Sequence, residues 1–102
     1  MTHGKKRRVV ILGSTGSIGL STLKVAESLF EEIEIVGLAA CSSVSKLAEQ
    51  ALETGVKHIG IYDETKESEL RSLLPSDVKI HTGAKGLEDL SQLTEADIVL
   101  VA

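Results

Sequence analysis

The chain has 102 residues, of which 42% are hydrophobic and 25% charged, and its formal net charge is −4. This length fits one small domain, and the acidic balance gives no electrostatic reason to expect nucleic acid or an anionic membrane as a partner. Phe30 and Tyr62 are the only aromatic residues. The core must therefore be built from Val, Ile, Leu and Ala, the usual composition of a parallel sheet covered on both faces.

Neither the cysteine content nor the amino end of the chain indicates export. Cys41 is the single cysteine, so no internal disulfide can form. The apolar run Val9–Leu12 is too short for the core of a signal peptide, and no stretch approaches membrane-spanning length. We therefore expect a cytoplasmic protein with no membrane partner.

In the first half of the chain, short apolar runs alternate with helical periodicity, the pattern of βαβ units in a mostly parallel sheet. The run Val9–Leu12 predicts a buried central strand. A helix is predicted over residues 17–30, and its inward face carries Gly19, Thr22, Leu23, Ala26 and Phe30. Residues 33–40 predict a second strand. A second helix follows, with Ser43 placed to cap its start and Gly55 placed to end it.

The second half continues the alternation with shorter elements. Residues 59–62 predict a third strand, and Asp63 is placed to cap a helix that stops at Pro75. Residues 78–82 predict a short edge strand. Leucines at positions 87, 90 and 93 predict a brief helix whose start is weakened by Gly83 and Gly86, and residues 98–101 predict a last buried strand.

These elements predict an α/β fold, a Rossmann-like three-layer sandwich with a mostly parallel sheet of about five strands in one domain, residues 1–102. The chain ends at Ala102, directly after a predicted strand. Open α/β sheets bind their ligands at the carboxyl ends of the strands, where that strand should feed a loop over the ligand. We therefore expect a fold truncated after its last strand, the N-terminal fragment of a longer protein.

The most informative segment is the glycine-rich turn Gly13-Ser14-Thr15-Gly16-Ser17-Ile18-Gly19, between the first strand and the first helix. Each glycine has its own steric purpose. Gly13 lets the chain leave the strand through a tight turn, Gly16 lets the backbone approach a pyrophosphate, and Gly19 lets the helix pack closely on the sheet. The alternative, a tight turn with no ligand, is less favoured because the turn lies inside a βαβ unit.

The start of this helix also predicts an anion site. Backbone N–H groups from about Thr15 to Ile18 have no intrahelical partner, and the helix dipole adds positive potential there. The hydroxyls of Ser14, Thr15 and Ser17 are further candidate donors. The Lys-Ser/Thr pair of a P-loop is missing, so a dinucleotide is favoured over a nucleoside triphosphate.

The end of the second strand indicates which dinucleotide. NAD-binding domains carry an acidic residue there for the ribose 2′-hydroxyl, but this strand ends Leu38-Ala39-Ala40-Cys41-Ser42-Ser43, without a carboxylate. Ser42 and Ser43 offer hydroxyls and amides to a 2′-phosphate, and Lys46 offers charge. Alternatively, Ser43 is only a helix cap. The pattern favours NADP over NAD.

No residues form a catalytic pattern. His3, His58 and His81 are scattered, and no spacing suggests a metal site. Cys41 has no basic neighbour in the sequence, so we interpret it as a small packing residue rather than a nucleophile. We predict no catalytic and no metal-ligating residue in this chain.

The string Val10-Ile11-Leu12-Gly13-Ser14-Thr15-Gly16-Ser17-Ile18-Gly19, followed by Ser21-Thr22-Leu23, closely resembles the opening of 1-deoxy-D-xylulose 5-phosphate reductoisomerases. It is far more specific than a general glycine pattern. By this resemblance, Thr15, Gly16, Ser17 and Ile18 contact the pyrophosphate of NADPH. With Gly13, Ser42 and Ser43 they complete the predicted cofactor-binding set. Many family members carry Gly-Lys-Asn where this chain has Cys41-Ser42-Ser43, and Lys46 is the charge that would substitute.

The resemblance implies an enzyme of non-mevalonate isoprenoid biosynthesis. Assisted by magnesium or manganese, such an enzyme rearranges 1-deoxy-D-xylulose 5-phosphate and then reduces the product with NADPH to 2-C-methyl-D-erythritol 4-phosphate. The metal ligands and the pocket for this small-molecule substrate are expected in a later domain, outside this chain. We expect the fragment alone to be inactive, holding and orienting the cofactor, and the full-length enzyme to be a homodimer.

Two other interpretations stay open at this stage. One is another NADP-dependent reductase, such as a semialdehyde dehydrogenase, which would need a nucleophilic cysteine elsewhere. The other is a nucleotide-sensing module with no chemistry of its own.

Overall fold

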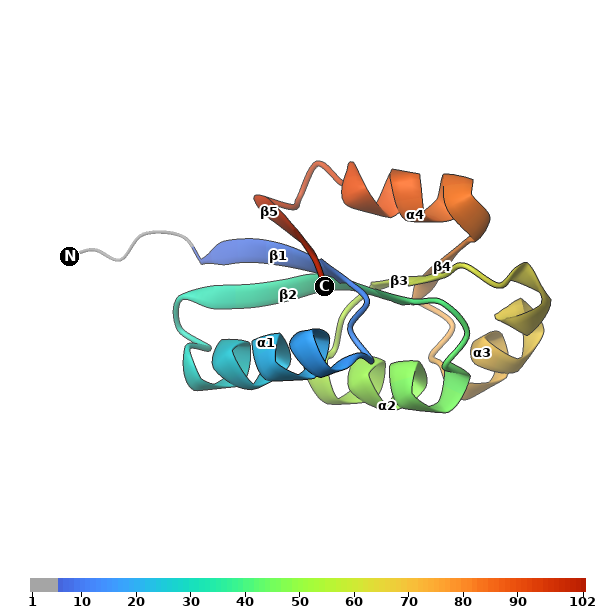
Figure 1. The fold of residues 1–102 in the computed structure, drawn as a ribbon, viewed down its shortest axis with the longest axis horizontal. Helices are drawn as coiled ribbons and strands as arrows, with labels where there is room; N and C mark the ends of the chain where they lie inside the picture. Colours follow the sequence, from blue (N-terminus) through green and yellow to red (C-terminus); the bar gives the residue numbers. More distant parts are fainter. Residues whose placement is uncertain (1–5) are drawn as a thin grey trace.

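The computed structural model describes residues 6–102, whose strands form one sheet (Figure 1). The strand order is β4-β3-β2-β1-β5, and every pair of neighbours is parallel. The predicted α/β class and the five-stranded parallel sheet are confirmed. The strands are β1 (Arg7–Leu12), β2 (Ile33–Ala40), β3 (His58–Ile61), β4 (Lys79–Thr82) and β5 (Ile98–Val101).

Helices cover both faces of the sheet, so the three-layer arrangement is also confirmed (Figure 1). On one face lie α1 (Ser17–Ser28), α2 (Val44–Thr54) and α3 (Glu67–Leu73), the last preceded by the 3-10 turn η1 (Glu64–Lys66). On the opposite face, α4 (Gly83–Ser91) is the one helix among residues 6–102. This arrangement explains why the buried strands are apolar on both sides.

Two apolar cores result, one on each side of the sheet. The larger lies under α2 and α3 and includes Ile11, Leu38, Leu47, Ile59 and Leu70. The smaller lies under α4 and is centred on Val10, Ala39 and Leu90. Because β1 contributes Val10 to one core and Ile11 to the other, and neither is exposed, the prediction of a buried inner strand at Val9–Leu12 is confirmed.

The cover provided by α4 depends on glycines in the strands beneath it. A Cβ added at Gly60 would lie 2.7 Å from Leu87 and 2.9 Å from Leu90, and one at Gly37 would lie 2.9 Å from Leu90. The two glycines therefore leave the space that the α4 leucines fill. The helix begins at Gly83 despite its glycines, and Gly86 lets it lie close to β4, since a Cβ there would lie 2.6 Å from the carbonyl carbon of His81.

The helices begin and end close to the capping and terminating residues predicted from the sequence. Gly55 ends α2 in the left-handed conformation, at φ 71°. The Asp63 carboxylate caps η1 by accepting from the Thr65 amide, and α3 ends at Leu73, before Pro75. Ser43 occupies the N-cap position of α2, but its side chain makes no capping hydrogen bond.

Two predictions about burial are wrong. The last strand is not buried: it is the edge strand beside β1, and Val101 is 75% exposed. Its apolar run Ile98–Val101 resembles that of an inner strand, but no strand among residues 6–102 pairs with its outer edge. Phe30 does not lie on the inward face of a helix, because α1 ends at Ser28 and the Phe30 side chain is 64% exposed.

Within residues 6–102, no helix has both the length and the apolar character needed to cross a bilayer. His3 lies outside the described residues.

Candidate functional site

The glycine-rich turn emerges from the carboxyl end of β1 and is fixed to the neighbouring strands. The amides of Gly13 and Ser14 both donate to the Ala39 carbonyl oxygen in β2, at 2.8 and 2.9 Å. Gly13 has φ 91°, a left-handed conformation, and a Cβ there would lie 3.0 Å from the Ala102 carbonyl oxygen. The predicted role of Gly13 is therefore confirmed: a side chain would be strained and would crowd the end of the chain.

The amino end of α1 presents backbone donors with no protein partner. The first intrahelical bond runs from the Leu20 amide to the Gly16 carbonyl, 2.9 Å. Within residues 6–102, the amides of Thr15, Ser17 and Ile18 donate no hydrogen bond, whereas the Gly16 amide closes the turn onto Gly13. No side chain caps this end, and its first turn holds no acidic residue. Three of the four predicted amides are thus free for a ligand.

The two remaining glycines of the turn meet very different surroundings. A Cβ at Gly16 would approach only the Gly13 carbonyl oxygen, at 3.6 Å, so the space in front of Gly16 is open. A Cβ at Gly19 would lie 2.3 Å from that same oxygen and 2.6 Å from the Ser14 Cα. Gly19 is buried where α1 begins, as predicted, so it serves packing, while Gly16 borders the open side of the turn.

The Ser14 hydroxyl, a predicted ligand donor, points toward α2 and away from the open side of the turn. The Ser14 side chain is fully buried, and its hydroxyl donates to Gln50 Oε1 at 2.7 Å, with the Ala39 carbonyl oxygen 3.5 Å away. The Ser14 hydroxyl therefore does not reach the ligand side of the turn, and that expectation is wrong. Its partner, Gln50 of α2, was missed from the sequence because it falls among the apolar residues of that helix.

Ser42 and Ser43 lie at the end of β2, on the same edge of the sheet as the turn. Both are exposed, and the turn bonds to Ala39 only a few residues earlier. At the start of α2, the first intrahelical bond runs from the Leu47 amide to the Ser43 carbonyl, 3.0 Å, and the first turn holds no acidic residue. The structure thus places both groups of predicted cofactor-binding residues along one edge of the sheet.

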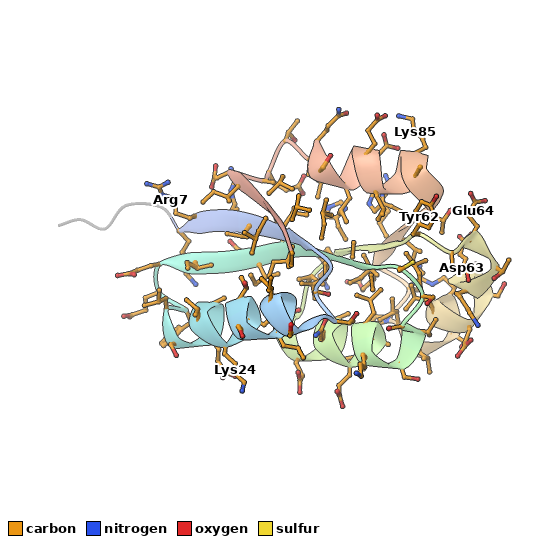
Figure 2. The ribbon with its side chains drawn as sticks, in the orientation of Figure 1. Arg7, Lys24, Tyr62, Asp63, Glu64 and Lys85 are labelled. Carbon is orange, nitrogen blue, oxygen red and sulfur yellow. The ribbon has the colours of Figure 1, made fainter. Side chains whose placement is uncertain are left out.

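A cavity of about 690 Å³ opens beside Ser42 at the carboxyl ends of β2, β3 and β4. Figure 2 shows Tyr62, Asp63 and Glu64 of its wall at the end of the sheet opposite Arg7. Asp63 Oδ1 accepts from the Thr65 amide at 3.0 Å and from the Thr65 hydroxyl at 2.6 Å, and these hydrogen bonds hold the pKa of Asp63 below its usual value. This carboxylate serves as a cap. Cys41 is exposed on the same wall, so its interpretation as a packing residue is wrong.

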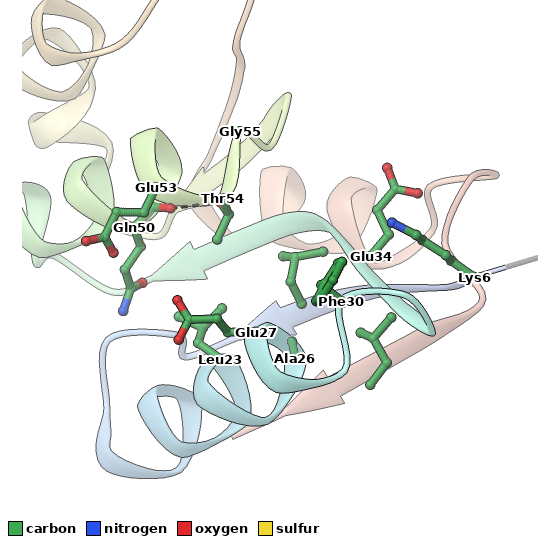
Figure 3. A pocket seen from close by; sticks show the side chains of 12 residues that line it. Lys6, Leu23, Ala26, Glu27, Phe30, Glu34, Gln50, Glu53, Thr54 and Gly55 are labelled. Atoms are coloured by element: carbon green, nitrogen blue, oxygen red, sulfur yellow. Dashed lines mark hydrogen bonds between the residues drawn. The ribbon is translucent and has the colours of Figure 1, made fainter.

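A second cavity, of about 340 Å³, lies between α1 and α2 (Figure 3). Leu23 and Ala26 line it from α1, and Gln50 and Glu53 line it from α2. Neither the glycine-rich turn nor Ser42 and Ser43 contribute to its lining. It is therefore separate from the edge that carries the free amides.

Two of the scattered histidines meet on neighbouring strands. His58 Nδ1 lies 3.2 Å from His81 Nε2, and His58 Nε2 lies 3.2 Å from Glu95 Oε2. His58 is the first residue of β3, so its ring lies toward the amino edge of the sheet. Among residues 6–102, no three His, Cys, Asp or Glu side chains gather in a way that could hold a metal ion.

This histidine pair predicts a pH dependence of stability. Burial, followed by the nearby charges of His58 and Lys79, lowers the pKa of His81 below its usual 6.5, although Asp89 opposes the shift. The unfolded chain therefore takes up a proton at His81 more readily than the folded one, and the free energy of unfolding should fall as the pH drops below about 6.5. Denaturant titrations at pH 7.5 and 5.5 measure this.

The control for this prediction is His81→Gln, which should flatten the change between the two pH values. The carboxylates with lowered pKa, Asp63, Asp77 and Asp97, titrate below their usual 3.8 and so outside this window. A protein more stable at pH 5.5 than at pH 7.5 would contradict the assignment.

A parallel sheet whose first strand ends in a glycine-rich turn, with free amides opening the following helix, defines a Rossmann-like domain of the dinucleotide-binding class. The sequence model of one family, described as 1-deoxy-D-xylulose 5-phosphate reductoisomerase, matches residues 9–102. The chain belongs to the 1-deoxy-D-xylulose 5-phosphate reductoisomerase family, as its glycine-rich turn predicted.

Individual relatives agree with this assignment. A reductoisomerase from Thermoanaerobacter sp. (strain X514) is 45% identical over 96 residues, which cover 94% of this chain and 25% of the relative. One from Nitratidesulfovibrio vulgaris (strain Hildenborough) is 41% identical over 102 residues, covering 98% of this chain and 25% of the relative. The chain thus spans about a quarter of the length of these curated relatives.

Solved structures give the same result. The reductoisomerase from Zymomonas mobilis in complex with NADPH has a TM-score of 0.86 at 33% identity, over 93% of this chain and 25% of that one. A reductoisomerase in complex with NADPH, fosmidomycin and magnesium has a TM-score of 0.77 at 30% identity, over 91% of this chain and 23% of that one. The family match favours the reductoisomerase interpretation over a semialdehyde dehydrogenase or a nucleotide-sensing module.

Proposed function

We propose that residues 1–102 form the NADPH-binding domain of a longer 1-deoxy-D-xylulose 5-phosphate reductoisomerase. The observation that carries the proposal is the uncapped amino end of α1, where the amides of Thr15, Ser17 and Ile18 have no partner among residues 6–102. A relative of the same fold is in complex with NADPH. The proposed cofactor-binding residues are Gly13, Thr15, Gly16, Ser17, Ile18, Ser42 and Ser43.

The energetics of the turn support a diphosphate as its ligand. The helix dipole places roughly half a positive charge at the amino end of α1. Each hydrogen bond to a charged group contributes about 1.5–3 kcal/mol, so three amides suffice for firm binding without a basic side chain. Gly16 leaves open the space that a phosphate oxygen needs for this approach.

Ser42 and Ser43 support a 2′-phosphate as the second anchor. Their hydroxyls are exposed at the end of β2, and the Ser43 hydroxyl is not used as a helix cap. No carboxylate occurs over residues 38–43, where one would repel a phosphate. Asp63, on the wall of the neighbouring cavity, follows β3 rather than β2, and its Oδ1 accepts two hydrogen bonds from Thr65. These features support NADPH over NADH.

Calorimetric titration of the protein with NADPH and with NADH tests this preference. We expect NADPH to bind at least about 10-fold more tightly, which corresponds to roughly 1.4 kcal/mol from the 2′-phosphate contacts. Tighter binding of NADH would contradict the proposal.

The control introduces the missing carboxylate. Ser42→Asp should weaken NADPH binding and narrow or reverse the preference, because the new charge stands beside the 2′-phosphate. Ser28→Asp adds the same charge at the exposed carboxyl end of α1 and should leave the preference unchanged.

The activity of the whole enzyme is part of the same proposal. When bound, NADPH supplies the hydride that reduces the rearranged substrate; this chain holds the cofactor and fixes its orientation. A divalent metal, magnesium or manganese, and the small-molecule substrate would bind outside residues 1–102, and solved relatives are in complex with magnesium and fosmidomycin. We further propose a cytoplasmic homodimer, with the 102-residue chain inactive by itself.

A further inference from the structure

Two polar side chains lie inside the otherwise apolar packing around the turn. Among residues 6–102, Ser14 and Gln50 are the buried polar residues, at 0% and 6% exposed. Gln50 belongs to the inward face of α2, between Leu47 and Ala51, where an apolar residue would be expected. A buried amide weakens folding unless its hydrogen bonds are satisfied, so the contacts of Gln50 need an explanation.

Gln50 and Ser14 form a closed pair of hydrogen bonds. The Gln50 side-chain nitrogen donates to the Ser14 carbonyl oxygen at 2.9 Å, and the Ser14 hydroxyl donates to Gln50 Oε1 at 2.7 Å. Figure 3 shows Gln50 extending from α2 toward the space between α2 and α1. One glutamine of the second helix thus binds both the backbone and the side chain of the glycine-rich turn.

The bond to the Ser14 carbonyl has a geometric consequence for the next residue. The Ser14 C=O and the Thr15 N–H belong to the same planar peptide group, and in a trans peptide they point in opposite directions. None of the described peptide bonds is cis. Because Gln50 holds the Ser14 carbonyl toward the core, the Thr15 N–H must point away from it, where it has no partner among residues 6–102.

We propose that Gln50 is a positioning residue of the nucleotide site, which aims the Thr15 amide at the cofactor diphosphate by holding the Ser14 carbonyl inward. This inference rests on the proposed function. Gln50 does not touch the cofactor itself. It sets the orientation of one peptide group, so its loss leaves the donor present but free to turn.

The first test is Gln50→Met, which keeps the length of the side chain and removes its donor. NADPH affinity should fall about 10-fold or more, in line with a weakened hydrogen bond to a charged group. Adenosine 2′-monophosphate, which lacks the diphosphate, should bind the folded variant as it binds the parent. A variant that was only less stable would lose both ligands in proportion to its unfolded fraction.

Two controls separate positioning from stability. Ser14→Ala removes the hydroxyl but keeps the carbonyl bond to Gln50, so NADPH affinity should stay within about 3-fold of the parent. Leu70→Ala weakens the same core from α3 without touching the turn, and its folded fraction should bind NADPH normally. Equal losses of affinity in Ser14→Ala and Gln50→Met would overturn the proposal.

Gln50→Glu gives a second readout that does not depend on Gln50→Met folding. At alkaline pH, where even a carboxyl group whose pKa is raised by burial is ionised, the new side chain cannot donate to the Ser14 carbonyl, so NADPH binding should weaken. When protonated, the carboxyl group regains a donor, so affinity relative to the parent should recover as the pH falls. Parent-like NADPH binding by Gln50→Met, or no recovery in Gln50→Glu, overturns the role of Gln50. By contrast, failure of the parent to bind NADPH overturns the proposed function.

Discussion

Replacement of Gly16 by Val is expected to abolish NADPH binding while the fold persists. The space in front of Gly16 is open, since an added Cβ would approach only the Gly13 carbonyl oxygen, at 3.6 Å. Gly16 has φ −82° and ψ 175°, which Val adopts without strain. The larger side chain would occupy the position of the diphosphate and separate it from the free amides. We expect affinity to fall at least about 100-fold, or roughly 2.7 kcal/mol.

Calorimetry measures this loss, and denaturant titration checks the fold. Because Val is a poor N-cap, the free energy of unfolding should fall by no more than about 1 kcal/mol. Ser21→Val places the same side chain on the exposed face of α1, one turn further along, and should bind NADPH as the parent does. If Gly16→Val bound NADPH with parental affinity, the turn would not be the site.

Replacement of Gly19 by Ala, in contrast to Gly16→Val, should strongly destabilise the fold. A Cβ there would lie 2.3 Å from the Gly13 carbonyl oxygen and 2.6 Å from the Ser14 Cα. Both are backbone atoms of the turn, so no side-chain rotation relieves the clash. Overpacking of this kind costs typically 1–3 kcal/mol, and we expect about 3 kcal/mol, a large share of the stability of a small domain.

The direction of the change in stability distinguishes two physical effects at Gly19. At an unconstrained helix position, Gly→Ala stabilises by about 1 kcal/mol, so helix propensity and packing predict opposite shifts of the denaturation midpoint. Ser21→Ala, on the exposed face of the same helix, should change stability little. A Gly19→Ala variant as stable as the parent would show that α1 does not pack against the turn as described.

Periodicity was sufficient to predict the elements of the fold because each strand and helix obeys a local pattern. The strand at Val9–Leu12 and the helix that ends at Gly55 depend only on local spacing, and both predictions are confirmed. Ile98–Val101 has an equally apolar pattern but lies at the edge of the sheet, because burial of a strand depends on what pairs with it. The exposure of Phe30 follows in the same way from a helix end two residues earlier than predicted.

Those features of the candidate site that depend on backbone geometry were predictable from the sequence. Gly13 has the steric role that its spacing indicated, and Gly19 is a close-packing position as expected, although it packs against the backbone of the turn rather than against a strand. The direction of a small polar side chain was not predictable, since Ser14 points to α2 rather than to the ligand side. Gln50 and the His58–His81 pair also required the structure, because residues 23 or more positions apart meet only after folding.

A structure of the protein with bound NADPH tests the central claim most directly. The account predicts diphosphate oxygens about 3 Å from the amide nitrogens of Thr15, Ser17 and Ile18, the distance of a normal hydrogen bond. The account would be contradicted if NADPH bound instead in the cavity between α1 and α2 and those three amides had no ligand.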